Sequence, residues 1–516
     1  MKKLWRQTWF RDGLMLFVIY LLIHGFMLIL TGTFHDDWTS WFRDAETKSL
    51  EGWESGRPYY SLVIEAVWWL PGYGYRILAF LTYFVSYLGM YLTLCHVPEI
   101  KRKGALWIAV LAMSMPINDA RVLLGNYPYA LGMMLFWIAA WLFVKNIHQL
   151  TRIPVRAGIL ILFFLSFTLN SNLVMYGGVL LYILIRVRPR EYIRYLDFAA
   201  LPIVFFLLNK ILFPTHGAFA AENYNAVTVS GLAWAIAAIP QTIRNLLLGM
   251  TETLTDNHVG LIAAIAAAVL CEAFLLWREH RKTGTPSAEQ VRAGEKQNLV
   301  TFLFGLVMFV AGFFSYTVVR EVAMLNLTGI TGRDSIQLGF GAALMLYSFP
   351  IKSLRRPMAI FAAVLAVFHF GNWYLYYQAE WYRELAFQKQ IVKIEEIAGG
   401  GNYVVNCSQN SAVEDRRFYT WSGNAAAATG RQNLFLFNGQ DSTGMLENPE
   451  TMSTILKEYP MFGEYVYHPE MDGKLDFEVH VSMEDAKRLK IQEMFHPDEF
   501  NNAIEQLGSI VYAKAE

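Results

Sequence analysis

The first residues whose types could do chemistry are two adjacent carboxylates, Asp36 and Asp37, which follow a nearly unbroken apolar run over residues 14–31. Such a run predicts a membrane-spanning helix, so the pair is expected at the membrane–water boundary. One carboxylate there can take a proton from a hydroxyl group as a general base. The other can orient the reacting group or hold a divalent cation, Mg²⁺ or Mn²⁺. The structural alternative is that Asp36 caps the next helix and Asp37 lies in its first turn.

The same loop contains aromatic and cationic side chains that could bind a substrate. Trp38, like Trp41 and Trp53, can stack on a sugar ring or simply anchor the loop at the membrane interface. Arg43 and Arg57 suit bidentate contact with a phosphate, with contact to lipid headgroups as the alternative. The loop therefore predicts a site for an anionic, lipid-borne substrate.

Further polar residues lie between later apolar segments. Polar and ionisable groups at this depth are costly and tend to face a cavity when several converge, although each one alone is more typical of a helix cap or a loop ion pair. The candidate substrate-binding residues among them are Asn126, Tyr127, Asn172 and Arg333, and the wider set adds Asn118, Asp119, Arg121, Asn170, Glu321 and Asp334. Arg333 and Asp334 also resemble a cap for a helix that begins near residue 336. His216 and Glu222 lack a recognised metal-ligand spacing.

The composition of the chain indicates which elements position these residues, because it is strongly apolar. The chain has 516 residues, of which 55% are hydrophobic and 17% charged, whereas a soluble protein has about a quarter charged residues. Its 15 tryptophans suit a polytopic membrane protein with aromatic belts. The net charge of zero excludes a nucleic-acid partner on bulk charge. The three cysteines are far apart, which excludes a disulfide framework.

Hydropathy predicts an α-helical polytopic membrane protein with about eleven transmembrane helices. The expected spans are residues 13–33, 74–95, 105–120, 127–145, 157–171, 173–188, 197–213, 258–277, 298–318, 336–351 and 357–378. Residues 59–71 are too short to span and are expected to lie in the interface. We expect surface helices within 214–257 and a flexible cytoplasmic loop at 282–297.

Charge predicts the orientation, because every second connection is basic. The basic residues involved are Lys2, Lys3, Arg6, Lys101, Arg102, Lys103, Arg186, Arg188, Arg190, Arg194, Arg278, Arg281, Lys282, Lys352, Arg355 and Arg356. The positive-inside rule places them and the N-terminus in the cytoplasm. The acidic loop then faces outside and, with an odd number of spans, so does the C-terminal part.

The C-terminal part differs in pattern from the rest of the chain. Residues 380–516 are polar, and short strand-like runs alternate with helix-like ones. The strand-like runs are 402–408, 433–439, 464–468, 476–482 and 509–513, and the helix-like runs are 449–460 and 497–507. This predicts a small extracytoplasmic α/β domain at 380–516. It would follow a transmembrane domain at 1–379 with an acidic first outer loop at 34–58.

Four segments resemble a known family in their order and spacing. They are FHDDW (34–38), GWESGRPYYSLVIEAV (52–67), NYPYALGMMLFWIAAWLF (126–143) and SFTLNSNLVMYGGVLLYIL (166–184). The pattern resembles the bacterial O-antigen-modifying, serotype-converting membrane glucosyltransferases, which belong to the GT-C class. The resemblance covers roughly the first 190 residues. The family commonly has an arginine soon after the acidic pair, and here the nearest, Arg43, comes later.

This resemblance implies an inverting glycosyltransferase in the bacterial inner (plasma) membrane. The donor would be a polyprenyl-phosphate sugar, often glucose, and the acceptor a lipid-linked or cell-surface glycan at the outer leaflet. By the same resemblance Asp36 or Asp37 is the base, the other carboxylate orients the acceptor or binds a metal, and Arg57 is a weaker candidate for the donor phosphate.

Other classes of protein remain as alternatives. A lipid-linked glycan transporter or flippase predicts mid-membrane charges and internal repeats. The sequence has few such charges and no internal repeat. An O-antigen polymerase or ligase would depend more on Arg and His in later loops. A structural membrane protein with a partner-binding tail would leave the outer polar residues without a role.

Overall fold

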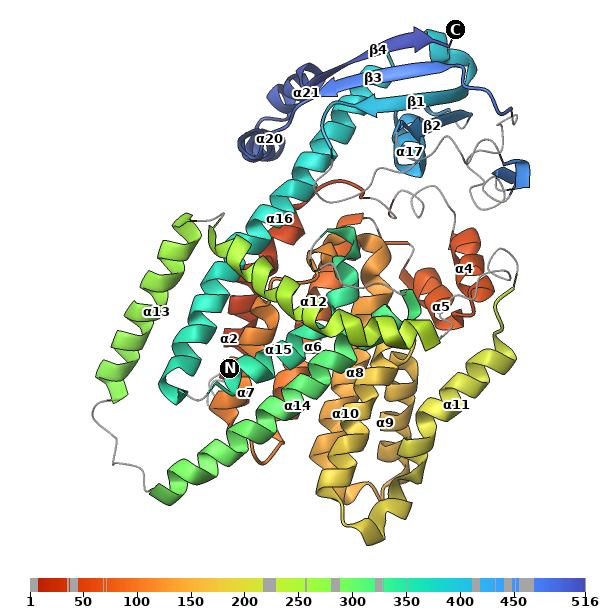
Figure 1. Ribbon diagram of the computed structural model, residues 1–516. Helices are drawn as coiled ribbons and strands as arrows, with labels where there is room; N and C mark the ends of the chain where they lie inside the picture. The colour runs from red at the N-terminus through yellow and green to blue at the C-terminus, as the bar shows by residue number, and fades with distance from the viewer. Residues whose placement is uncertain are drawn as a thin grey trace.

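The computed structural model describes residues 8–34, 37, 45–67, 69–70, 72–216, 229–255, 258–279, 288–320, 327, 329–349, 351–410, 418–431, 433–439, 448–450, 452–453 and 468–515. Over these ranges the chain forms a large body of helices, and one long helix joins this body to a small sheet (Figure 1). The sheet contains the last described residues of the chain.

A helix coincides with each apolar segment predicted from hydropathy. These helices are α2 (Thr8–His24), continued by the 3-10 helix η1 (Gly25–Ile29), α6 (Gly72–Cys95), α7 (Arg102–Ser114), α8 (Tyr127–Asn146), α9 (Ile153–Ser166), α10 (Ser171–Arg186), α11 (Leu196–Leu212), α13 (His258–Glu279), α14 (Ala288–Arg320), α15 (Leu338–Tyr347) and α16 (Arg355–Ile391). In the described part of the chain, six segments are long and apolar enough to cross a membrane. The protein is therefore an integral membrane protein. The total of about eleven spans stays a prediction.

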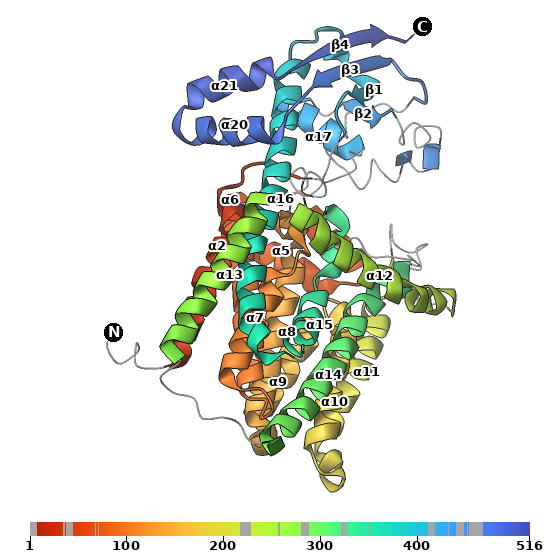
Figure 2. The same cartoon turned by 60° about the vertical axis from the view of Figure 1, so that its left-hand side comes forward.

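Two surface elements lie outside these apolar helices. The amphipathic helix α12 (Val229–Thr255) falls within the segment predicted to form surface helices, and it lies across the helical body (Figures 1 and 2). The hairpin of α4 (Ala45–Glu54) and α5 (Pro58–Val67) includes residues 59–67 of the segment 59–71 that is predicted to lie in the interface.

The prediction of a flexible loop at 282–297 is wrong for residues 288–297. These residues form the first turns of α14, whose sequence begins AEQVRAGEKQ. Ala, Glu, Gln, Lys and Arg are strong helix formers, so the polar segment extends the apolar helix that follows it.

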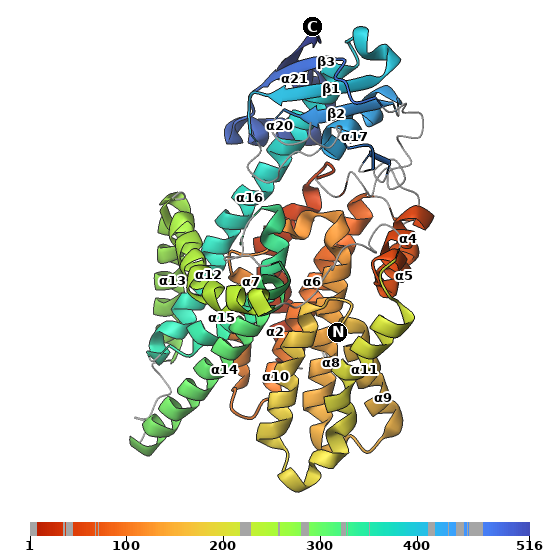
Figure 3. The ribbon, with the colours of Figure 1, turned by 45° about the vertical axis from the view of Figure 1, so that its right-hand side comes forward.

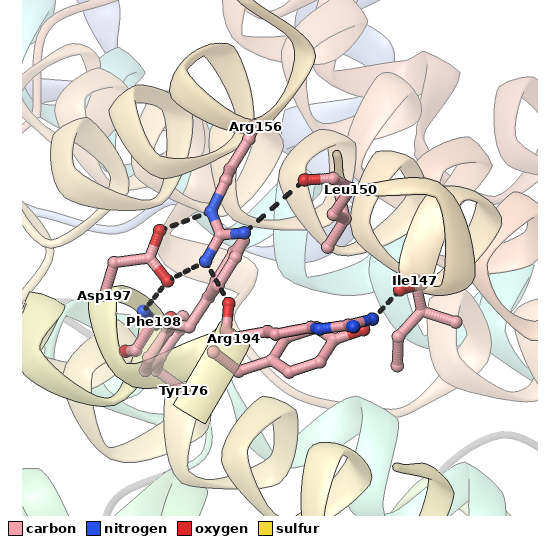
Figure 4. A network of polar contacts seen from close by, with 8 residues as sticks. Ile147, Leu150, Arg156, Tyr176, Arg194, Asp197 and Phe198 are labelled. Atoms are coloured by element: carbon pink, nitrogen blue, oxygen red, sulfur yellow. Dashed lines mark hydrogen bonds and ion pairs between the residues drawn. The ribbon is translucent and has the colours of Figure 1, made fainter. Parts of the chain in front are cut away.

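The basic connections share one side of the body. The connections α6–α7, α10–α11 and α15–α16 lie at the ends of their helices that are farther from the sheet (Figures 1 and 3). On this side Arg156 of α9 forms a bidentate ion pair with Asp197 of α11, with Nε–Oδ2 and Nη2–Oδ1 distances of 2.6 and 2.5 Å (Figure 4). The basic side and the side that bears the sheet are thus opposite ends of one body.

The C-terminal part is a four-stranded mixed sheet with the order β2-β1-β3-β4. The strands are β1 (Gly401–Cys407), β2 (Leu434–Asn438), β3 (Gly473–Val479) and β4 (Gly508–Lys514). Strand β1 pairs in parallel with β2 and β3, and β4 pairs antiparallel with β3. The helices are α17 (Phe418–Thr429), α20 (Met483–Phe495) and α21 (Pro497–Gln506). Four of the predicted strand-like runs thus form strands, and nearly all of the fifth, 464–467, is outside the described residues.

Helix α16 joins the two hydrophobic cores. Its Phe370 and Tyr374 belong to the core of the helical body, while Phe387 and Ile391 belong to the core beneath the sheet. At about 1.5 Å rise per residue, a helix of this length reaches from one core to the other without interruption. The boundary expected at residue 379/380 falls inside this helix, so the sheet is attached to the helical body through a continuous element.

Candidate functional site

The carboxylate of Asp37 lies at the sheet-side end of the helical body and is almost fully buried, with 1% of the residue exposed. Its Oδ1 accepts a hydrogen bond from the backbone N–H of Gly125 at 2.9 Å, and its own N–H donates to the carbonyl oxygen of Phe34 at 2.9 Å. Asp37 thereby connects the segment after the first span to the turn before α8. A buried carboxylate held by a backbone amide has a fixed orientation.

A buried arginine, Arg76 of α6, lies beside this segment. Its Nη1 donates to the carbonyl oxygen of Leu30 at 2.8 Å, and its Nη2 donates to that of Gly32. The guanidinium lies over the ring of Phe34, 5.7 Å from the centroid, and is electrostatically attracted by the carboxylate of Asp37. Arg76 therefore fixes the backbone that leads into the acidic pair and supplies positive charge beside it.

Two predicted substrate-binding residues, Asn126 and Tyr127, lie next to Gly125. The side-chain amide of Asn126 is buried and donates to the carbonyl oxygen of Ala120 at 2.8 Å. Tyr127 is the first residue of α8, and its ring packs edge-on against Tyr75, with 6.3 Å between the centroids. The structure thus places both residues directly after Gly125, whose amide binds Asp37, and Asn126 shapes the turn that contains Gly125.

A second buried cation, Arg121, is enclosed deeper in the body, with 1% of the residue exposed. It lies in the 3-10 helix η2 (Asp119–Val122) and donates to the carbonyl oxygens of Asn118 and Ile117 at 2.8 and 3.2 Å. Its guanidinium lies over two aromatic rings, those of Tyr83 and Phe370, at 5.3 and 5.0 Å from their centroids. Among the described residues no carboxylate forms an ion pair with Arg121.

His24 of the first span completes this buried cluster. Nη1 of Arg121 is 3.0 Å from Nε2 of His24, and Nδ1 of His24 is 3.0 Å from the hydroxyl oxygen of Tyr374. Because a guanidinium only donates, Nε2 must accept, so the proton is on Nδ1 and is donated to Tyr374. The carbonyl oxygen of Met113 also lies 3.1 Å from Nε2, and a hydrogen bond to it would require the other tautomer, with the proton on Nε2. That tautomer would direct an N–H at the permanently charged guanidinium of Arg121, so it is disfavoured.

Asp119 connects η2 to the 3-10 helix η7 (Ile330–Ser335), which contains Arg333. Oδ2 of Asp119 accepts from the N–H of Gly329 at 3.0 Å, and the N–H of Asn118 donates to Oγ of Ser335 at 3.1 Å. The carboxylate of Asp119 is fully buried and is electrostatically attracted by the guanidinium of Arg121.

The prediction that Arg333 and Asp334 cap the helix that follows is wrong. They lie inside η7, and the residue at the start of α15 is Gln337, whose side chain makes no capping bond. The pair belongs to a tight 3-10 turn because Asp119 and Asn118 bond the residues at its two ends.

Asn172 belongs to a different network. Its Nδ2 donates to the carbonyl oxygens of Gly132 and Ser166 at 3.0 and 2.9 Å, and its Oδ1 accepts from Nε2 of Gln337 at 2.6 Å. The residue is fully buried, and these bonds connect α8, α9, α10 and the start of α15. Buried amides satisfied in this way stabilise helix packing in a membrane protein. The geometry favours a structural role for Asn172.

Arg57 lies in the turn between α4 and α5. Its N–H donates to the carbonyl oxygen of Gly52 at 2.7 Å, and the neighbouring Gly56 accepts from Nδ2 of Asn209 at 2.9 Å. The ring of Trp53 packs against that of Phe213, with 5.8 Å between the centroids. The hairpin that contains Arg57 and Trp53 is therefore docked on the end of α11.

Several predicted site residues lie outside the described part of the chain: Asp36, Trp38, Trp41, Arg43, Glu222 and Glu321. His216 is described, and its Nδ1 lies 3.0 Å from the carbonyl oxygen of Pro214. Within the described ranges no three His, Cys, Asp or Glu residues form a group that could hold a metal ion. A cation bound by Asp36 and Asp37 stays a prediction.

Sequence reasoning missed His24 and Arg76 as parts of the site. Both had a signal, because each is an ionisable residue within an apolar run, where such residues are costly and face the protein interior. Their partners are a tyrosine of α16 and backbone carbonyls of residues 30–32, which no local pattern links to them.

Comparisons with known proteins leave the family open. No protein family and no curated protein matches the sequence. Among solved structures, the crystal structure of ArnT from Cupriavidus metallidurans in the apo state aligns over 93% of each chain, with 11% identity and a TM-score of 0.33. A likeness of this size assigns neither a fold nor a function to the chain.

Proposed function

We propose that this protein is an integral-membrane glycosyltransferase of the GT-C class. It would move a sugar, glucose being the first to test, from a polyprenyl-phosphate donor to a lipid-linked or cell-surface glycan by an inverting reaction. The reaction would take place at the outer leaflet of the bacterial inner membrane, with the acidic loop and the sheet on the extracytoplasmic side. The opposite, basic side would face the cytoplasm, as the positive-inside rule requires.

The observation that carries this proposal is the fixed carboxylate of Asp37 at the sheet-side end of the first span, bonded to Gly125 and flanked by Arg76. A polyprenyl-phosphate sugar already has a good leaving group, so the protein must supply a base for the acceptor hydroxyl. It must also supply positive charge for the phosphate that departs. The acidic pair offers the base, and the arginines of the first outer loop, Arg43 and Arg57, offer the charge.

The two carboxylates would have different roles in the reaction. Asp37 is buried and engaged by the Gly125 amide, which supports an orienting role for it. We therefore assign the base to Asp36. Successive side chains leave the backbone in different directions, so a pair with one anchored member and one reacting member is the simplest arrangement.

A second candidate function, a transporter of lipid-linked glycans, is favoured by one observation. The buried Arg121–His24 contact lies within the helical body. Intramembrane ionisable groups of this kind mark ion and substrate pathways in transporters. In the enzyme proposal, this cluster instead stabilises the packing of the helices that hold the outer site.

The test uses the purified full-length chain in lipid nanodiscs, a panel of polyprenyl-phosphate sugars and a lipid-linked glycan acceptor. The proposal expects a new glycosidic product from one donor. In parallel, proteoliposomes report movement of fluorescent lipid-linked glycan between leaflets. Movement without any product would overturn the enzyme proposal in favour of the transporter.

A further inference from the structure

Thr31, the second residue beyond the first span, is held by the C-terminal part of the protein. Its hydroxyl donates to Oε1 of Glu493 in α20 at 2.6 Å and accepts from Nε2 of Gln378 in α16 at 2.8 Å. Its backbone N–H donates to Oε1 of the same Gln378 at 3.0 Å. Both polar groups that Thr31 can donate from are therefore bonded to α16 or α20.

Glu493 is itself fixed on the domain side. Its Oε2 accepts from the hydroxyl of Tyr382 at 2.9 Å and pairs with Nζ of Lys490 at 2.7 Å, and both the carboxylate and the lysine are largely buried. The ring of Tyr382 packs edge-on against Phe500 of α21, with 5.4 Å between the centroids. The carboxylate that holds Thr31 is thus anchored in the core of the sheet domain.

Position 32, directly after Thr31, can accommodate only glycine. Gly32 has φ +113°, and a Cβ there would lie 2.4 Å from Cγ of Trp381 in α16. On the opposite side, Arg76 donates to the carbonyl oxygens of Leu30 and Gly32. Arg76 is also electrostatically attracted by both Asp37 and Glu493. The segment 30–32 is therefore held between α6, α16 and α20, a few residues before Asp37.

We propose that Glu493 and Thr31 are positioning residues, through which the C-terminal domain sets the conformation of the acidic segment that ends at Asp37. The domain would thus contribute directly to the reaction site. For its effect on catalysis this inference rests on the proposed function. Its structural part does not, because the conformation of residues 30–37 can be measured without any substrate.

The experiment is hydrogen–deuterium exchange of the full chain in nanodiscs, followed on peptides that cover residues 26–38. Glu493→Ala is expected to raise amide exchange in these peptides at least tenfold. Thr31→Val, which keeps the side-chain volume and leaves Lys490 paired, is expected to do the same. The matched control is Asp485→Ala, which removes one half of the capping box of α20 and has no hydrogen bond to the described residues 30–34 and 37.

Unchanged exchange over residues 26–38 in both Glu493→Ala and Thr31→Val would overturn the inference. An equal rise in Asp485→Ala would also overturn it, because general loosening of α20 would then explain the effect. Where sugar transfer is measurable, Thr31→Val is expected to lower kcat at least fivefold with KM for the donor unchanged. A rise in KM alone would speak for donor binding and against positioning. If neither the parent nor any variant transfers sugar, the proposed function is wrong, and the hydrogen–deuterium exchange result still decides this inference.

Discussion

The backbone N–H of Gly125 donates to the carboxylate of Asp37 at 2.9 Å, and this one bond joins two connections between helices that are 88 residues apart in the chain. It ties the segment after the first span to the turn that begins α8. Asn126 holds the same turn from the other side through the carbonyl oxygen of Ala120. Asp37, the second residue of the acidic pair, is therefore fixed in place by tertiary contacts.

Substitutions of Asp37 separate its charge from its hydrogen bond. Asp37→Asn keeps an oxygen that accepts from Gly125, so we expect a nearly unchanged melting temperature. Asp37→Ala leaves the Gly125 amide without its acceptor and is expected to cost about 1–3 kcal/mol. Thermal unfolding in nanodiscs checks both. Equal melting temperatures for the two variants would contradict an anchoring role.

Gly32 is expected to tolerate no side chain. Gly32→Ala forces a Cβ against Trp381 at a positive φ, and we expect a loss of about 2–4 kcal/mol. The control is Gly177→Ala in α10, where no heavy atom lies within 4 Å of the added Cβ. Replacing a helical glycine there should stabilise the protein by up to about 1 kcal/mol. Comparable unfolding temperatures for Gly32→Ala and the parent would refute the packing described here.

Asn172 is expected to affect stability and not substrate affinity. Asn172→Ala removes two donated bonds and the acceptor of Gln337. Polar contacts between membrane helices contribute on the order of 1 kcal/mol each, so we expect a loss of about 1–2 kcal/mol. The check is thermal unfolding together with KM for the donor. A large rise in KM at unchanged stability would return Asn172 to the substrate-binding set.

The membrane helices could be predicted from the sequence because each is an apolar run in its own right. Hydropathy depends only on local composition, and α6 and α8 begin and end within two residues of their predicted limits. The strands β1 and β2 could be predicted for the same reason, since each is a short apolar run between turn residues.

The junction between the two cores could not be predicted in this way. Beyond residue 378 the sequence AEWYRELAFQKQI is polar overall, and hydropathy therefore ends the span there. The helix continues because Tyr382, Phe387 and Ile391 pack under the sheet. The partners of Asp37 and Thr31 are likewise distant in sequence, and only the tertiary structure brings Gly125 and Glu493 to them.

The central claim, that the acidic pair supplies the base for sugar transfer, is tested most directly by Asp36→Asn in the purified protein. With a polyprenyl-phosphate sugar panel, we expect transfer to fall at least about a hundredfold at an unchanged melting temperature. The control is Asp197→Asn, which breaks the ion pair with Arg156 on the opposite side of the body and should leave transfer at the parent level. Transfer by Asp36→Asn at the parent rate would contradict the assignment of the base.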